Sequence, residues 1–356
     1  MRYEIITYHN AINYGAMLQA YALQTFLTGR GSSCEILNFG KIPDKIVNIR
    51  QERIRGVFKI PYYLALRNLY GKFREFHEKK LRLTKYYSNY EELKTRTSYP
   101  DILLVGSDQV WNPLKIKPEF YADFAPASIY KASYAASIGI SKIPSDRVEK
   151  FTKLIGYMDK ISVREKDAKI LLNNITRNED ISVNVDPVFL LDKEDWAKLE
   201  KPYEVDKKYG KYIFCYILYR DPWLNQRLKQ ISQQTGLKVI VVELGGYRDI
   251  YHHKMIRDAG PEEFLSLLHH AELVITSSFH GTALSILYGK PFYTVVNPNA
   301  NSRIINILER FSLKERILNP QCEIKLKAPD YQAIQKVLYN EREKTENYFE
   351  KIESEV

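Results

Sequence analysis

The chain has 356 residues, of which 45% are hydrophobic and 27% charged, as in a folded globular protein and unlike a disordered or collagen-like chain. This length predicts two domains. The net charge is +10, from 53 basic and 43 acidic residues, which allows a nucleic acid, an anionic membrane or an anionic substrate as partner.

The first part of the chain alternates predicted strands and helices. An apolar run over 2–8 predicts a strand, helical spacing of apolar residues over 18–27 predicts a helix that Gly29 ends, and 34–39 predicts another strand. Strands and helices continue to alternate over 101–105, 130–137, 148–158, 160–163 and 165–172. This order predicts a doubly wound α/β domain with a parallel sheet over 1–187.

Nearly all of the excess charge lies in an insertion over 41–100, which holds 15 basic and 6 acidic residues. Apolar residues among the cations predict basic helices in this insertion. Two interpretations stay open. The helices rest on an anionic membrane surface, where a lipid-linked substrate would arrive, or they present a solvated face and pack on the first domain.

A second α/β alternation follows Asp186-Pro187 and runs to the last predicted strand at 292–296. It predicts a second doubly wound domain over 188–328, and a Glu/Lys-rich helix over 329–356 that we expect to pack back on the first domain. In such a pair of domains, ligands bind at the carboxyl ends of the strands and in the cleft between the domains.

The location and cofactors follow from what the sequence lacks. The cysteines stand far apart without a CxxC pair, at Cys34, Cys215 and Cys322, which argues against a disulfide framework and a cysteine zinc site. No secretory pattern opens the chain and no apolar run is long enough to span a bilayer, so we expect a cytoplasmic protein. A peripheral location at the inner face of the membrane stays open. The adjacent pairs His252-His253 and His269-His270 lack the usual spacing of metal ligands, and we expect no metal.

The sequence Thr276-Ser277-Ser278-Phe279-His280-Gly281 joins an apolar strand to an apolar helix. Ser278 can cap the helix, whose first N–H groups then face an anion, and His280 can supply a proton. Gly281 permits close approach of a ligand to the backbone. The alternative is a histidine that bonds buried backbone groups at the end of the strand.

A second candidate turn, Asn13-Tyr14-Gly15, lies between the first strand and the first helix. Asn13 is a natural cap and Gly15 leaves room for a ligand against the backbone, although capping alone explains both residues. The third candidate follows the strand at 101–105 and presents a cluster of hydrogen-bonding side chains: Ser107, Asp108, Gln109, Trp111 and Asn112. This set suits a sugar face and its hydroxyls, and an Asx-turn would explain Asp108 alone.

Arg164 leaves a predicted strand where a helix begins. Its guanidinium could bind a carboxylate or a phosphate through two hydrogen bonds. The alternative is a surface ion pair with Glu165 or Asp167.

Taken together, these segments resemble the polysaccharide pyruvyl transferase family over about residues 1–310. The matching segments are NYGAMLQAYALQTFL, DILLVGSDQVWNP, YAASIG, ISVREKDA, VDPVFLL and AELVITSSFHGTALSILYGKPF. The resemblance implies two Rossmann-like domains that face a cleft, as in GT-B glycosyltransferases. It also implies transfer of pyruvate from phosphoenolpyruvate to two hydroxyls of a sugar in a capsule, exopolysaccharide or cell-wall precursor, forming a ketal, without a metal or organic cofactor.

The resemblance also implies roles for individual residues. His280 is the expected general acid, Arg164 the ligand of the donor's carboxylate or phosphate, and Asp108 a candidate general base. The expected substrate-binding residues are Asn13, Tyr14, Gly15, Ser107, Gln109, Trp111, Asn112, Ser278, Gly281 and Arg303. Ser278 stands where a better-studied branch has an arginine, in a Ser-x-Arg-x-His pattern, and Arg303 is a candidate replacement for a lost cation.

Two other functions remain open. The double α/β pattern, with Gly260-Pro261-Glu262-Glu263 before a helix, is compatible with a glycosyltransferase that uses a nucleotide sugar. A non-catalytic module that binds glycan or nucleic acid through 41–100 ranks third. We expect phosphoenolpyruvate and a nucleotide- or lipid-linked sugar as partners, and no nucleic acid.

Overall fold

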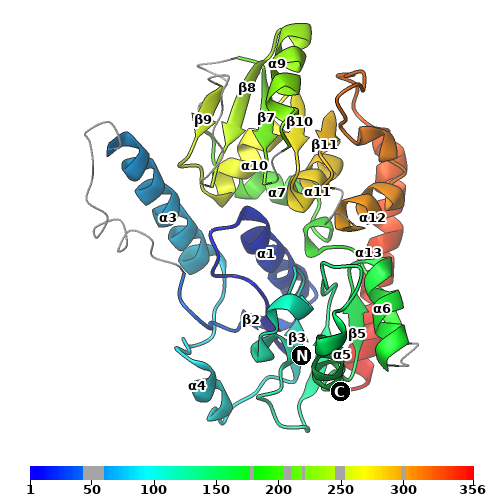
Figure 1. Cartoon of the computed structure of the whole chain (residues 1–356). Helices are drawn as coiled ribbons and strands as arrows, with labels where there is room; N and C mark the ends of the chain where they lie inside the picture. The colour runs from blue at the N-terminus through cyan, green and yellow to red at the C-terminus, as the bar shows by residue number, and fades with distance from the viewer. Residues whose placement is uncertain are drawn as a thin grey trace.

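The computed structural model describes residues 1–42, 60–176, 180–203, 205, 210–218, 221–244, 253–297 and 302–356 (Figure 1). Part of the predicted basic insertion, residues 43–59, lies outside the described residues, as does His252.

The first sheet is parallel, with the strand order β2-β1-β3-β4. Its strands are β1 (Arg2–Ile6), β2 (Ser33–Ile36), β3 (Ile102–Val105) and β4 (Tyr130–Ser133). Isolated bridges beside β4 lead on to the parallel pair of β5 (Ile161–Val163) and β6 (Ile181–Val183). All of β3 is buried, as expected for a parallel strand covered by helices on both faces.

Helices connect these strands and carry the chain out of the first domain. They are α1 (Tyr14–Gly29), α3 (Ile60–Lys80), α4 (Tyr90–Lys94), α5 (Ser145–Ile155) and α6 (Lys166–Thr176), with 3₁₀ turns η2 (Pro113–Lys115), η3 (Pro118–Tyr121) and η4 (Pro187–Phe189). Helix α1 is apolar on most of its surface because it also contacts η4 and the second domain.

The second sheet is parallel in the order β11-β10-β7-β8-β9. Its strands are β7 (Tyr212–Tyr216), β8 (Lys238–Val242), β9 (Lys254–Ile256), β10 (Leu273–Thr276) and β11 (Phe292–Thr294). The helices of this part of the chain are α7 (Lys193–Leu199), α9 (Leu224–Thr235), α10 (Pro261–His269), α11 (Phe279–Leu287) and α12 (Ser302–Arg310), with η5 at Lys314–Arg316. The predicted α/β class with two doubly wound sheets is confirmed.

The C-terminal helix α13 (Tyr331–Ser354) runs back from the second domain along the side of the first (Figure 1). The Tyr348 hydroxyl donates to the Ser133 carbonyl of β4 at 2.6 Å, and the Tyr3 hydroxyl of β1 donates to Glu353 at 2.8 Å. These contacts tie the end of the chain to the first sheet.

Helix α3, within the predicted basic insertion, lies at the left in Figure 1, beside the junction of the two domains. Its Phe73 ring lies 5.1 Å from the ring of Tyr14 on α1. On the other side, Lys72 pairs with Glu263 of α10 at 2.6 Å. Part of the basic charge on α3 therefore neutralises acidic residues of the second domain. Among the described residues, no helix is both long and apolar enough to cross a bilayer.

Candidate functional site

A cleft of about 520 Å³ opens where the carboxyl ends of the two sheets face each other. Side chains from both domains line it, and the polar ones are Asn13, Asp108, Gln109, Asn112, Lys115, Ser277, Ser278, His280, Asn297 and Arg303. The size and the few convergent polar groups are typical of a small-molecule site. Seven of the thirteen predicted site residues line the cleft: Asn13, Asp108, Gln109, Asn112, Ser278, His280 and Arg303.

Two helix N-termini open on this cleft. The Asn13 side chain caps α1 by accepting the Ala16 N–H at 3.2 Å, and the Ser278 side chain caps α11 by accepting the Gly281 N–H at 3.3 Å. Both caps line the cleft. Because a helix N-terminus carries partial positive charge, both helices favour an anion in the cleft.

His280 lies in the first turn of α11 and is only 7% exposed. Its Nε2 atom is 3.5 Å from Oδ2 of Asp186. Its ring also lies against Gly15 of α1, where an added Cβ would be 1.9 Å from Nδ1. The space that Gly15 leaves is therefore filled by His280, which corrects the prediction that a ligand uses it.

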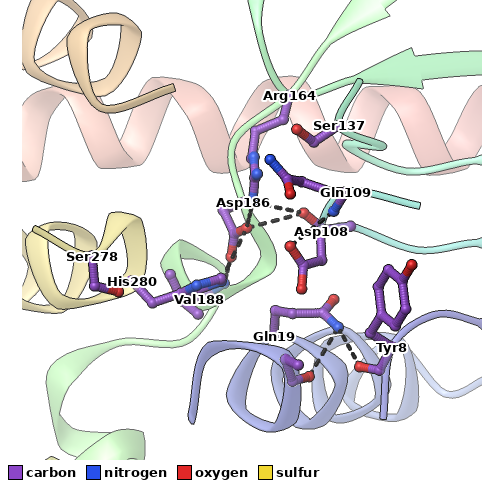
Figure 2. Close-up of polar contacts among 12 residues, drawn as sticks. Tyr8, Gln19, Asp108, Gln109, Ser137, Arg164, Asp186, Val188, Ser278 and His280 are labelled. Atoms are coloured by element: carbon purple, nitrogen blue, oxygen red, sulfur yellow. Dashed lines mark hydrogen bonds and ion pairs between the residues drawn. The ribbon is translucent and has the colours of Figure 1, made fainter. Parts of the chain in front are cut away.

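Asp186 joins residues from several parts of the chain (Figure 2). Its Oδ2 accepts hydrogen bonds from Ser107 Oγ at 2.9 Å and from Arg164 Nη1 at 2.6 Å, besides its contact with His280. Burial alone would raise the pKa of Asp186, but His280 and Arg164 outweigh it and hold the pKa well below its usual range. Asp186 is therefore a carboxylate that can orient and stabilise a protonated imidazole.

Asp186 was not among the predicted site residues, although it lies in the matching segment VDPVFLL. An acidic residue between apolar stretches was the available signal, because a buried carboxylate needs hydrogen-bond or charge partners. The partners themselves are distant in the sequence.

Arg164 is buried behind the cleft. Its Nε donates to Glu165 at 3.0 Å, and its guanidinium lies 4.2 Å from the centre of the Phe279 ring. It lines a small inner hollow of about 20 Å³, and only Nη2 lacks a hydrogen-bond partner among the described residues. The structure places the charge of Arg164 against Asp186 and Glu165, and direct binding of the donor by Arg164 stays a prediction.

Arg303 of α12 lines both the inner hollow and the cleft. Its Nε has no hydrogen-bond partner among the described residues. Burial, and to a lesser extent repulsion from Arg164, lowers the pKa of Arg303. Guanidinium groups stay charged in proteins, so a bound anion would stabilise this one. Arg303 is thus the better candidate for direct contact with an anionic substrate.

Asp108 follows β3 with a left-handed backbone, at φ 74°. This conformation is uncommon for a residue with a side chain. Two backbone N–H groups, of Val110 and Ser137, donate to its carbonyl at 2.8 and 2.9 Å and hold the turn. The side chain of Asp108 lines the cleft, on a different element from His280 (Figure 2).

A family model described as polysaccharide pyruvyl transferase matches residues 13–299, most of the chain. The chain belongs to the polysaccharide pyruvyl transferase family. The match includes Asp108, Arg164, Asp186 and His280, and it ends just before Arg303. Comparison with curated protein sequences gives no significant match.

Solved structures similar to this pyruvyl transferase family member include UDP-GlcNAc 2-epimerases. The match to the UDP-GlcNAc 2-epimerase of Methanocaldococcus jannaschii covers 95% of this chain and 99% of the epimerase chain, with a TM-score of 0.53 and 13% sequence identity. The match to the S. aureus MnaA–UDP co-structure covers 96% of this chain and 90% of the MnaA chain, with a TM-score of 0.55 and 13% sequence identity. At such identities the similarity concerns the fold, which is the GT-B-like fold predicted from the sequence.

Four predicted site residues of the pyruvyl transferase family member lie away from the cleft. Trp111 is fully buried and its indole donates to the Phe120 carbonyl at 2.9 Å. Tyr14 is buried too, and its hydroxyl donates to the Ala259 carbonyl at 2.7 Å. Ser107 is enclosed beside Asp186. A Cβ at Gly281 would lie 2.5 Å from the Thr276 hydroxyl, so this glycine permits packing of α11 on β10. The predicted ligand contacts of these four residues are therefore corrected to structural roles.

Two other features of the sequence also lie outside the cleft. Glu200, His269 and His270 bring potential metal-ligand atoms within 4.8 Å of one another. Glu200 already accepts hydrogen bonds from His269 and from the Tyr288 hydroxyl, and the group lies near the amino end of β10, away from the cleft. Glu262 and Glu263, which motivated the nucleotide-sugar hypothesis, face α3 in ion pairs with Lys80 and Lys72.

Proposed function

We propose that the protein transfers pyruvate from phosphoenolpyruvate to two hydroxyls of a sugar in a glycan precursor, forming a pyruvate ketal and releasing phosphate. The observation that carries the proposal is the contact between His280 and Asp186 beside two helix N-termini. It places a proton donor, oriented by a carboxylate, where an anionic substrate would bind.

The cleft offers several groups that suit the two anionic ends of phosphoenolpyruvate. They are the N-termini of α1 and α11 and the guanidinium of Arg303. Arg303 can bind a carboxylate or phosphate through two hydrogen bonds. In this proposal Arg164 does not touch the donor, and it acts together with His280 to keep Asp186 ionised.

Proton transfer starts the proposed reaction. His280, as imidazolium, donates a proton to C3 of phosphoenolpyruvate, and the first sugar hydroxyl adds to C2 as its proton passes to Asp108. A second hydroxyl then displaces phosphate from C2. The proton on Asp108 returns through solvent to His280, which restores the imidazolium, and the proton of the second hydroxyl leaves with the phosphate. Protons and electrons therefore balance without an oxidant or reductant.

The proposal also covers where the protein works and which carrier holds the acceptor sugar. Free thiols at Cys34, Cys215 and Cys322 fit a reducing cytoplasm. A nucleotide- or lipid-linked sugar is the proposed acceptor, and a lipid-linked one would bring the protein to the membrane surface. Ion pairs from α3 to α10 leave less of the basic insertion for lipid, so we expect only weak sedimentation with anionic liposomes.

The test is to incubate the protein with phosphoenolpyruvate and a panel of nucleotide- and lipid-linked sugars, and to measure released phosphate and the added pyruvyl mass. The variant His280→Gln should lower the rate about 10²–10⁴-fold, the usual contribution of a general acid. The matched control is His270→Gln, at an exposed histidine outside the cleft. Turnover of a UDP-sugar without phosphoenolpyruvate would favour the glycosyltransferase alternative instead.

A further inference from the structure

A second hollow, of about 90 Å³, lies beside the cleft at the carboxyl edge of the first sheet. The ends of β1 and β2 and the turn η3 form it, with Tyr8, His9, Asn10, Phe39, Lys117 and Glu119 among its lining residues. Tyr8 also lines the cleft, so one wall is shared by both spaces. Groups bound in the cleft and in the hollow would therefore both lie against the Tyr8 side chain.

The shared wall is a braced aromatic ring. The Tyr8 ring lies 4.7 Å from the ring of Phe120, and Lys117 Nζ lies 5.3 Å from the centre of the Tyr8 ring. Burial, with the nearby carboxylates of Asp108 and Glu119, raises the pKa of Tyr8 to about 12, so its hydroxyl stays protonated. A rigid ring with an apolar face and a polar tip suits the stacking of a sugar.

The polar groups of the hollow can both donate and accept hydrogen bonds. Burial raises the pKa of Glu119, and no ion pair or hydrogen bond to another residue holds its carboxyl among the described residues. His9 is only 3% exposed, and its Nε2 has no hydrogen-bond partner there either. Burial lowers the pKa of His9 to about 4, so its imidazole is neutral near pH 7.

The charges of the hollow decide the class of occupant. Lys117 and Glu119 offset each other, and none of the residues that line the space belongs to an α-helix, in contrast to the cleft with its two α-helix N-termini and Arg303. A phosphate or carboxylate gains little there. A neutral polyhydroxyl ring can use the aromatic wall together with the mixed donors and acceptors.

We propose that this hollow is a second saccharide subsite, which binds the sugar unit next to the one that receives the pyruvyl group. The proposal rests on the proposed function for the place of the reacting sugar in the cleft. It names the acceptor class as a glycan of at least two units. Phe39 and Glu119 contact the outer unit, and Tyr8 separates it from the reacting unit.

The experiment is a ligand-observed NMR titration with methyl glycosides of glucose, galactose, mannose and N-acetylglucosamine, and with disaccharides built from these sugars. At least one disaccharide should bind about tenfold more tightly than its single units, as one added stacking contact allows. Phe39→Ala and Glu119→Gln should abolish this gain without changing the affinity for the single sugar. Matched controls are Tyr86→Ala and Glu91→Gln, at exposed residues outside both spaces.

The subsite is refuted if no disaccharide binds more tightly than its units, or if the gain survives both variants. Phosphoenolpyruvate is titrated in parallel, and its affinity should not change in Phe39→Ala or Glu119→Gln. Failure to bind phosphoenolpyruvate, together with a disaccharide preference that depends on Phe39, would remove the proposed donor and leave the subsite in place.

Discussion

A methyl group at Gly15 tests the arrangement of the proposed site without removing any functional group from it. In Gly15→Ala the added Cβ would lie 1.9 Å from Nδ1, 2.4 Å from Cγ and 2.6 Å from Cε1 of His280. Ordinary contact begins at 3.4 Å, so the nearest ring atom must retreat by the difference, 1.5 Å. The contact between His280 Nε2 and Asp186, now 3.5 Å, cannot survive such a shift unchanged.

The expected loss follows from that displacement. A misplacement of roughly 1 Å in a catalytic group costs about 10²-fold in rate, so we expect kcat for pyruvyl transfer to fall by about that factor or more. Forcing an extra carbon into a packed site also destabilises a protein by about 1–3 kcal/mol, measurable by urea unfolding. The matched control is Gly29→Ala in the same helix, where an added Cβ meets no atom within 4 Å.

A double variant separates the clash from other effects of the substitution. In a His280→Ala background the ring is absent, so Gly15→Ala should cost little further stability and no further activity, because the two changes act through one contact. Gly15→Ala with wild-type kcat and stability would refute the reasoning, and so would a loss that persists unchanged in the His280→Ala background.

The remaining predictions concern one anion ligand, one buried charge and one core side chain. Arg303→Met should raise KM for phosphoenolpyruvate about 10–100-fold, because it removes a hydrogen bond to a charged group. Arg303→Lys keeps the positive charge and should restore part of the lost affinity. An unchanged KM in Arg303→Met would exclude direct contact. The folded-state pKa of Asp186 is depressed, so its carboxylate stabilises the fold above pH about 4 and this stabilisation is lost as the pH falls further. Asp186→Asn should therefore cost about 3–5 kcal/mol at pH 7 and less at pH 3, by urea unfolding at both; an equal cost at both pH values would contradict this. Trp111→Phe should lower the free energy of unfolding by about 1–3 kcal/mol, measured by urea unfolding, because the Phe120 carbonyl loses its hydrogen-bond donor. A raised KM for the acceptor would show instead that Trp111 contacts the sugar.

Local patterns in the sequence were enough to predict the elements that carry the site. The strand Leu273–Thr276 has the predicted bounds, and Ser278 caps the next helix as expected, because apolar runs and caps depend on neighbours in the chain. The short strands β6 and β9 were not predicted, because Ile181–Val183 and Lys254–Ile256 stand among polar residues without an apolar run, whereas the equally short β11 lies in an apolar run and β5 lies between two helical patterns.

The roles of several site residues depend on contacts between segments that are distant in the sequence, and these contacts could not be predicted from local patterns. The glycine at 15 signalled close packing, but His280, which fills the space, comes from the other domain. Trp111 lies among cleft residues in the sequence, yet its side chain turns into the core beside Tyr121. Asp186 gains its importance only where Ser107, Arg164 and His280 converge, and no local pattern reports that convergence.

The return of α13 to the first sheet has a consequence for synthesis on the ribosome. The rings of Tyr134 and Phe349 stack with their centres 5.2 Å apart, and the hydroxyl groups of Tyr134 and Thr345 are hydrogen-bonded at 3.1 Å. The first domain emerges early, but these partners follow the whole second domain in the chain. Its core beside β4 stays open to solvent until α13 has been synthesised, so this domain cannot finish folding before the second domain is made, as N-terminal domains commonly do.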